Sequence, residues 1–216
     1  MTAKTRLLGI VFTTLLAPTA WAAGSAEAGA AKAATCLACH GPNGNGMAAL
    51  PDQPKLAGQN AAYTLAQLKA WHDGKRLDAS GRMPPMAMIL AEQDMEDLAA
   101  YFEAQTPEGA ETDAATWQAG QKLFVGGDRA RQIPACSACH GPSGQGTPAN
   151  GYPALRAQSA IYTTKQLTNY AAGTRYGTGA KGASAGGANA VIMQTIAKRL
   201  SADDIRDLAA YVQGLR

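Results

Sequence analysis

The sequence predicts an all-α protein built from two tandem copies of one small domain. Apolar side chains recur with the helical spacing i, i+3, i+4 and i+7 near the end of each half of the chain. These positions are Met95, Leu98, Ala99 and Phe102 in the first half, and Ile205, Leu208, Ala209 and Val212 in the second. The chain contains no convincing strand run, so we expect both domains to be small helical bundles.

An internal repeat covers nearly all of the chain after residue 22. Three pairs of blocks carry it: 54–59 matches 153–158, 63–71 matches 162–170, and 98–101 matches 208–211. The polar segment 106–115 carries Pro107 and Gly109 and is typical of a linker. We therefore predict domains over 23–105 and 116–216, joined by this linker.

Helices are expected in the same order in both copies. Each copy has a block with the pattern Tyr-x-x-x-Gln-Leu, followed one turn later by another aromatic residue. A helix that carries Trp117, Gly120 and Phe124 should lead into the second cysteine motif. Ser201 and Asp204 have the spacing of a cap at the start of the last helix.

The four cysteines form two copies of one motif. The copies of Cys-x-x-Cys-His are Cys36, Cys39 and His40, and Cys136, Cys139 and His140. This motif is the attachment signature of c-type haem. On a helix, positions i, i+3 and i+4 share a face, so two thiols could reach the two vinyl groups of one porphyrin while the imidazole approaches the iron. We predict two covalently bound haem c groups, with His40 and His140 as iron ligands.

Disulfide bonds and a zinc site are the two other uses of such cysteines. Disulfide bonds would give no reason for the histidine after each pair or for the shared flanking residues. A single zinc site would need both pairs, whereas each pair lies inside its own complete repeat. Haem attachment therefore explains more of the pattern.

Methionine is the candidate for the second axial position of each iron, because a thioether ligand favours the ferrous state. Met193 is the sole methionine of the second half, and it stands seven residues before Leu200. Leu90 is the repeat counterpart of Leu200, and Met83 stands seven residues before Leu90. The repeat thus selects Met83 and Met193 as the two sulfur ligands.

Other residues compete for the first iron. Met86 is the reserve ligand, and His72 is a rival whose repeat counterpart is an alanine. Met86 and Met95 align with isoleucines and are expected in the core, while Met88 aligns with Lys198 and is expected at the surface. Ordinary packing is the alternative role for each methionine.

The surroundings of the porphyrins are less well defined by the sequence. Six side chains are candidates for propionate or porphyrin-edge contacts, with packing or surface positions as the alternative: Lys55, Tyr63, Trp71, Arg156, Tyr162 and Tyr170. Aromatic residues make up only 6% of the chain. A buried porphyrin should supply the missing apolar bulk of each domain, so we expect haem-free protein to fold poorly.

The two copies differ most in a Gly- and Ala-rich segment, 177–190. It lengthens the interval between histidine and methionine from 43 residues in the first copy to 53 in the second. We expect a flexible surface loop there. A loop that docks a partner is the alternative.

The start of the chain, 1–22, is typical of a secretory signal peptide. It has Lys4 and Arg6, then an apolar stretch, and then a small-x-small cleavage site at Ala20, Trp21 and Ala22. Retention of this segment as a membrane anchor is the alternative.

Charge is distributed unevenly over the rest of the chain. Residues 23–112 carry 6 Lys/Arg and 11 Asp/Glu, whereas residues 114–216 carry 11 Lys/Arg and 4 Asp/Glu. The molecule should be a dipole along its domain axis, which can orient charged redox partners. The basic residues are scattered and the protein is expected to be exported, so we expect no nucleic-acid partner.

The chain resembles the di-haem class I cytochromes c, most closely the cytochrome c4 family. The resemblance rests on both Cys-x-x-Cys-His motifs, both Tyr-x-x-x-Gln-Leu helices, Met83 and Met193 ahead of a Leu-x-x-x-Asp helix start, and the closing Leu-Ala-Ala-Tyr helices. It implies two tandem class I cytochrome c domains, each wrapped around one covalently bound haem c. It also implies a pseudo-twofold axis, with the two haems facing each other across the domain interface.

The resemblance also implies a function. Such a protein is periplasmic, soluble or loosely membrane-associated, and carries electrons from quinol–cytochrome c reductase towards a haem-copper terminal oxidase. One alternative is a di-haem subunit of a dehydrogenase complex, such as a flavocytochrome sulfide dehydrogenase. Another is a di-haem enzyme, such as a peroxidase or a thiosulfate-oxidising cytochrome, which needs an open or unusual axial position. The sequence favours a carrier that is not an enzyme and that we expect to be a monomer.

Overall fold

The computed structural model describes residues 24–77, 80–111, 114–177 and 185–215. The predicted signal peptide, 1–22, and the middle of the Gly/Ala-rich segment lie outside these ranges. Helices dominate the described chain, which contains isolated β-bridges and no β-sheet. No helix in these ranges is long and apolar enough to cross a membrane.

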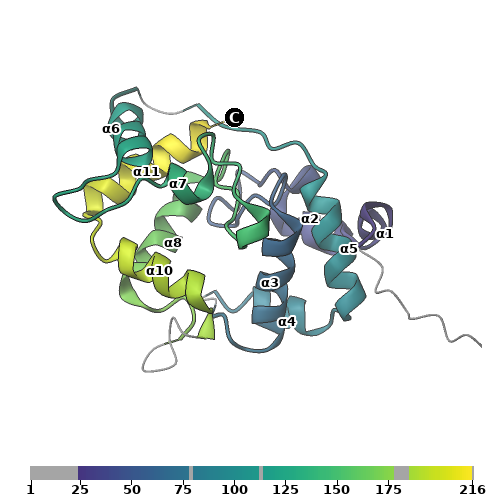
Figure 1. The fold of residues 1–216 in the computed structure, drawn as a ribbon. Helices are drawn as coiled ribbons and strands as arrows, with labels where there is room; N and C mark the ends of the chain where they lie inside the picture. The colour runs from purple at the N-terminus through teal and green to yellow at the C-terminus, as the bar shows by residue number, and fades with distance from the viewer. Residues whose placement is uncertain (1–23, 78–79, 112–113, 178–184, 216) are drawn as a thin grey trace, which may run out of the picture.

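The first domain is a bundle of five α-helices and one 3₁₀ turn. They are α1 (Ala26–Lys32), α2 (Ala34–His40), the turn η1 (Pro42–Gly44), α3 (Ala61–His72), α4 (Met83–Met88) and α5 (Glu92–Glu103). Helix α1 packs against α5, and α3 packs against both α4 and α5. These helices form the purple-to-teal half of the molecule in Figure 1.

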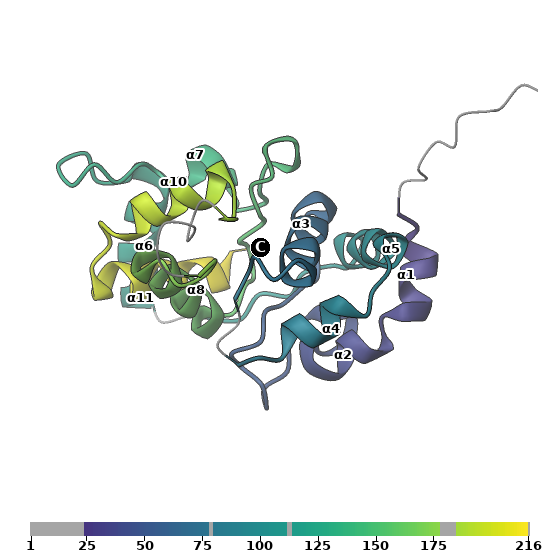
Figure 2. The ribbon, with the colours of Figure 1, turned by 90° about the horizontal axis from the view of Figure 1, so that it is seen from below.

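The second domain repeats this plan. Its elements are α6 (Ala114–Gly126), α7 (Ser137–His140), the turn η2 (Pro148–Asn150), α8 (Ala160–Ala172), α10 (Ala188–Ala197) and α11 (Ala202–Gly214). Helix α6 packs against α11, and α8 packs against both α10 and α11. Figure 2 shows the two bundles side by side. The predicted all-α fold of two tandem, pseudo-symmetric domains is confirmed.

In both domains a glycine lets the first helix cross the last at very close range. A Cβ atom added to Gly29 of α1 would lie 2.1 Å from the carbonyl oxygen of Asp97 in α5. A Cβ atom added to Gly120 of α6 would lie 2.1 Å from the carbonyl oxygen of Asp207 in α11. Glycine is therefore the residue that this backbone contact requires.

The apolar cores are small for two bundles. The fully buried cluster of the first domain consists of Ala33, Leu98 and Phe102. That of the second domain consists of Leu123, Phe124, Ile133, Leu208, Tyr211 and Val212. One cysteine of each motif, Cys36 or Cys136, packs against the cluster of its own domain. A group attached to these cysteines would therefore extend the core.

Two glutamines link the domains through reciprocal hydrogen bonds. The side-chain amide of Gln59 accepts from the backbone N–H of Ala154 and donates to its carbonyl, at 2.8 and 2.9 Å. The amide of Gln158 makes the same two bonds with the backbone of Lys55, both at 2.9 Å. Gln59 and Gln158 are repeat counterparts, so the interface has the symmetry of the repeat.

The linker is tied to both domains where the structure describes it. Lys55 Nζ donates to the carbonyl oxygen of Glu108, and the amide of Asn45 also binds the linker, at Thr106 and Glu108. The backbone carbonyl of Gln213 in α11 accepts from the backbone N–H of Ala110. Lys55, one of the candidates for a porphyrin-edge contact, thus binds the linker in this structure.

Candidate haem sites

Each cysteine motif lies on a short helix that ends at a glycine. Cys36, Cys39 and His40 belong to α2, which is followed by Gly41 at a φ of 77°. The second motif enters α7, which is followed by Gly141 at a φ of 80°. No disulfide bond joins any of the four cysteines. The described residues also contain no cluster of three or more His, Cys, Asp or Glu that could hold a metal ion, which argues against the zinc alternative.

Both motif histidines are buried, with one ring nitrogen in contact with a carbonyl. Nδ1 of His40 lies 2.8 Å from the carbonyl oxygen of Pro54, and Nδ1 of His140 lies 2.9 Å from that of Pro153. When Nδ1–H donates to a carbonyl, Nε2 keeps its lone pair and can bind a metal. Burial lowers the pKa of both histidines, so the imidazoles are neutral in neutral solution, as ligation requires.

A pocket at the domain interface is lined by residues of both domains. From the first domain it is lined by Pro54, Trp71, Arg76 and Met83, among others. Met83 therefore shares a pocket with the residue whose carbonyl faces the ring of His40. Tyr162 and its neighbours on α8 line the pocket from the second domain. The second domain thus contributes to the pocket that contains the candidate ligand Met83.

Arg76 is a component of this pocket that sequence analysis missed. Its side chain is buried, with 5% of the residue exposed, and its guanidinium lies 3.8 Å from the ring centroid of Trp71. It donates to Gln67 of its own domain at 2.8 Å and to the hydroxyl of Tyr162 in the other domain at 3.0 Å.

Arg175 makes the equivalent contacts from the second domain. It is 3% exposed, and its guanidinium lies 4.9 Å from the ring centroid of Tyr170. It donates to Gln166 of its own domain, and to the hydroxyl of Tyr63 in the first domain at 2.8 Å. Each arginine therefore binds the glutamine of the Tyr-x-x-x-Gln-Leu block in its own domain and the tyrosine of the block in the other domain. The sequence Gly-x-Arg occurs at 74–76 and again at 173–175, which are equivalent positions of the repeat. This recurrence could have identified both arginines.

The donors around these arginines fit the anionic edge of a haem. Four buried N–H groups have no hydrogen-bond partner in the described part of the chain: Nε of Arg76, Arg156 and Arg175, and Nε1 of Trp71. Neither Arg76 nor Arg175 takes part in an ion pair of the described residues. Buried donors normally have acceptors, and a buried cation needs an anion. Porphyrin propionates would supply both the acceptors and the negative charge.

The methionines take different positions in the two domains. Met83 is the first residue of α4 and is followed by two prolines, whereas Met193 lies in the middle of the longer α10. Both are half-buried. Met95 is buried and Met88 is 63% exposed, as expected. The expectation that Met86 lies in the core is wrong: Met86 is 36% exposed, because the short α4 turns Ala87 inward instead.

The rival ligand His72 is exposed at the end of α3. Its ring nitrogen Nδ1 lies 3.3 Å from the carboxylate of Asp73. This position agrees with the predicted surface location of His72.

Comparison with known proteins identifies the family. The Cytochrome c family profile matches the chain twice, over residues 26–105 and 117–216. A protein named cytochrome c4 from Pseudomonas aeruginosa is 43% identical over 211 residues, which cover 97% of this chain and 98% of that protein. The chain belongs to the cytochrome c4 family.

Two further relatives extend the comparison. The crystal structure of reduced recombinant cytochrome c4 from Pseudomonas stutzeri has a TM-score of 0.78 at 42% identity, and covers 90% of this chain and 100% of that one. A protein from Thiomonas intermedia named thiosulfate dehydrogenase electron acceptor is 38% identical over 164 residues, which cover 74% of this chain and 71% of that protein.

Membership of this family assigns the two motifs. The protein is a di-haem electron-transfer cytochrome with two covalently bound haem c groups. The pairs Cys36 with Cys39 and Cys136 with Cys139 fit thioether attachment of one haem each. The predicted cofactor is therefore confirmed.

Proposed function

We propose that this cytochrome is an electron carrier and not an enzyme. Its iron ligands would be His40 with Met83 and His140 with Met193. The main support is the paired design of the two sites, in which a buried histidine with Nδ1 on a proline carbonyl recurs together with a methionine at the repeat-equivalent position. Two occupied axial positions leave no site at the iron for a substrate.

The proposed pathway runs through the periplasm. The carrier would take electrons from quinol–cytochrome c reductase and pass them towards a haem-copper terminal oxidase. A cleavable signal at 1–22 would deliver the chain there, and sequencing of the mature N-terminus should then begin at Ala23. Retained residues 1–22 would contradict cleavage while leaving the carrier function intact.

The residues of the chain bind and orient the group rather than react. When bound, haem supplies a one-electron ferric–ferrous couple whose potential depends on the axial sulfur. The carbonyls of Pro54 and Pro153 fix the orientation of the two histidine rings. Arg76 and Arg175 would stabilise the propionates. Because each arginine also binds a tyrosine of the other domain, the two sites are held in a fixed relation.

An optical redox titration of the purified holoprotein, repeated under carbon monoxide, tests the proposal. Two six-coordinate, high-potential haems that do not bind carbon monoxide are expected. A haem that binds carbon monoxide would lack its methionine ligand, and the enzyme alternative would then be preferred.

A dehydrogenase is the second candidate for the electron donor. The relative named thiosulfate dehydrogenase electron acceptor supports this candidate, which corresponds to the dehydrogenase-linked alternative considered from the sequence. Affinity purification from the native host separates the two candidates. A dehydrogenase that co-purifies stoichiometrically and reduces the cytochrome would favour the second candidate over quinol–cytochrome c reductase.

A further inference from the structure

The two domains differ in charge at one pair of equivalent surface positions. In the first domain, Met88 ends α4 and Ile89 follows it, with 63% and 76% of these residues exposed. In the second domain the repeat counterparts, just after α10, are Lys198 and Arg199, and both are exposed. The repeat thus presents an apolar pair in one domain and a basic pair in the other.

A loop found only in the second domain brings a further cation to the basic pair. Residues 127–135 join α6 to the second cysteine motif, whereas α1 and α2 of the first domain are separated by Ala33 alone. Arg199 donates from Nη1 to the carbonyl oxygen of Gln132 in this loop at 2.9 Å. The exposed Arg129 lies on the same loop.

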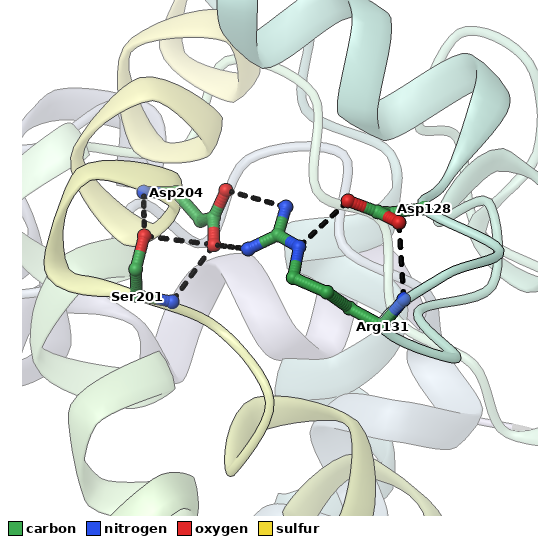
Figure 3. A network of polar contacts seen from close by, with 4 residues as sticks. All are labelled: Asp128, Arg131, Ser201 and Asp204. Carbon is green, nitrogen blue, oxygen red and sulfur yellow. Dashed lines mark hydrogen bonds and ion pairs between the residues drawn. The ribbon is translucent and has the colours of Figure 1, made fainter.

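The loop is held firmly in place. Arg131 binds Asp128 of the loop at 2.6 Å and Asp204 of α11 at 2.5 Å, and Asp204 also caps α11 with Ser201 (Figure 3). The backbones of Asp128 and Ile133 exchange two hydrogen bonds, each of 2.8 Å. The charge of Arg131 is therefore neutralised, while the loop that carries Arg129 keeps a fixed shape.

We call Arg129, Lys198 and Arg199 the basic face. None of the three forms an ion pair with an acidic side chain in the described part of the chain. The four acidic residues of the second half, Asp128, Asp203, Asp204 and Asp207, are each paired with Arg131 or Arg206 instead. The basic face thus keeps its positive charge.

The basic face is connected to the second haem motif in two ways. Its loop runs directly into Cys136. Leu200, the residue after Arg199, packs against the same core cluster as Cys136. A partner seated on this face would therefore dock on the domain that carries the second haem motif.

We propose that the basic face docks an acidic electron-transfer protein, so that electrons enter or leave the molecule through the second haem. This inference rests on the proposed carrier function. Uncompensated positive charge beside a redox centre attracts a partner of opposite charge and raises its association rate. A protein is favoured over an anionic membrane, because lipid recognition typically uses clusters of four to eight basic residues rather than three.

Electron transfer from the reduced holoprotein to an acidic plastocyanin, followed by stopped-flow absorbance, tests the inference. The test variant is Arg129→Gln with Lys198→Gln, because no hydrogen bond or ion pair of the described residues involves either side chain. We expect a second-order rate constant about tenfold lower than for the natural protein at low ionic strength, and equal rates in high salt. The control is Lys122→Gln, which removes one positive charge that likewise forms no ion pair among the described residues, from an exposed position on α6, and its rate should stay within about twofold of the natural one.

Three outcomes would overturn the inference. Equal slowing per charge removed in the test variant and in Lys122→Gln would mean that overall charge, not this face, attracts the partner. A natural rate that does not fall with salt would mean that charge has no role. Loss of binding to phosphatidylglycerol vesicles in the test variant, with plastocyanin kinetics unchanged, would assign the face to a membrane. Carbon-monoxide binding by the natural protein would instead contradict the proposed function.

Discussion

At the scale of single residues, the sulfur ligands carry the most direct prediction. Met193→Ala should lower the potential of one haem and remove about half of the weak sulfur-to-iron charge-transfer absorption, because a thioether favours ferrous iron. Met83→Ala should do the same to the other haem. Optical redox titration of each purified variant measures both effects.

The exposed Met88 provides the control for these variants. It is 63% exposed and lies five residues after Met83 on the same helix. Met88→Ala should leave both potentials and the charge-transfer band unchanged. An unchanged band in Met193→Ala would show that Met193 is not a ligand.

Asp97 gives the first domain a dependence on pH. Its carboxylate binds Lys32 Nζ at 2.6 Å and the backbone N–H of Ser25 at 2.9 Å, and these bonds lower its pKa from 3.8 to about 2. A carboxylate with a lowered pKa stabilises the fold above its ordinary pKa, and this stability is lost as the pH falls through the folded-state value. Thermal stability should therefore fall between about pH 4 and pH 2, in part through protonation of Asp97.

The substitution Asp97→Asn isolates the contribution of this carboxylate to the pH dependence of stability. Asp97→Asn should be less stable than the natural protein at neutral pH, and its melting temperature should change less between pH 4 and pH 2. Asp203→Asn is the control, because the side chain of Asp203 is 77% exposed. If Asp97→Asn kept the full acid dependence, other carboxylates would have to account for it.

At the scale of whole helices, the crossing of α6 and α11 depends on Gly120. The methyl group of Gly120→Ala would lie 2.1 Å from the carbonyl oxygen of Asp207, and backbone has little freedom to move away. We expect the free energy of unfolding to fall by about 1–3 kcal/mol, the usual cost of overpacking. Denaturant unfolding of the holoprotein measures this loss.

Gly126 is the matched control on the same helix. A Cβ atom there would meet nothing within 4 Å. Gly126→Ala should leave stability unchanged or raise it by up to about 1 kcal/mol, because alanine is the better helix former. Equal destabilisation by both substitutions would mean that the close contact at Gly120 is not the cause.

Local pattern was enough to predict some elements but not others. Helices α3 and α8, the cap of α11 by Ser201 and Asp204, and the buried position of Met95 all follow from spacing within the chain. Met86 was misplaced because its exposure depends on how the short α4 turns against α3, which alignment to an isoleucine does not specify.

The contacts between arginines and tyrosines at each site could not be predicted from the sequence for a similar reason. Arg76 and Arg175 are buried in part by Tyr162 and Tyr63, which are 86 and 112 positions away and meet them across the interface. The sequence predicted that Tyr63 and Tyr162 face a porphyrin edge or pack. Their bonds to arginines of the opposite domain need a tertiary placement that no local pattern contains.

At the scale of the whole molecule, the two sites share one polar network. Arg76, Gln67, Tyr63 and Arg175 form a continuous chain of hydrogen bonds across the interface, since Arg175 also binds Gln67 at 3.3 Å. The symmetric clasp of Gln59 and Gln158 fixes the same interface. A change in charge or hydrogen bonding at one site should therefore shift the redox potential of the haem at the other site.

Arg76→Gln tests how strongly the network controls potential. A buried positive charge disfavours ferric iron, so its removal should lower the potential of the first haem by on the order of 50 mV, for an effective dielectric constant of about 20. Lys75→Gln is the control, because Lys75 is exposed and paired with Asp73 at 2.8 Å, so solvent should screen its charge. Equal shifts in both variants would contradict a special role for Arg76.

Tyr162→Phe then tests whether control crosses the domain interface. Its hydroxyl lies 3.0 Å from Arg76, and its loss leaves that guanidinium with one fewer fixed acceptor. We expect the potential of the first haem to shift more than that of the second, although the substitution lies in the second domain. Tyr101→Phe removes a hydroxyl from α5, outside this network, and should shift neither. A shift confined to the second haem would mean that each domain sets its own potential, and that the crossed arginines only hold the domains together.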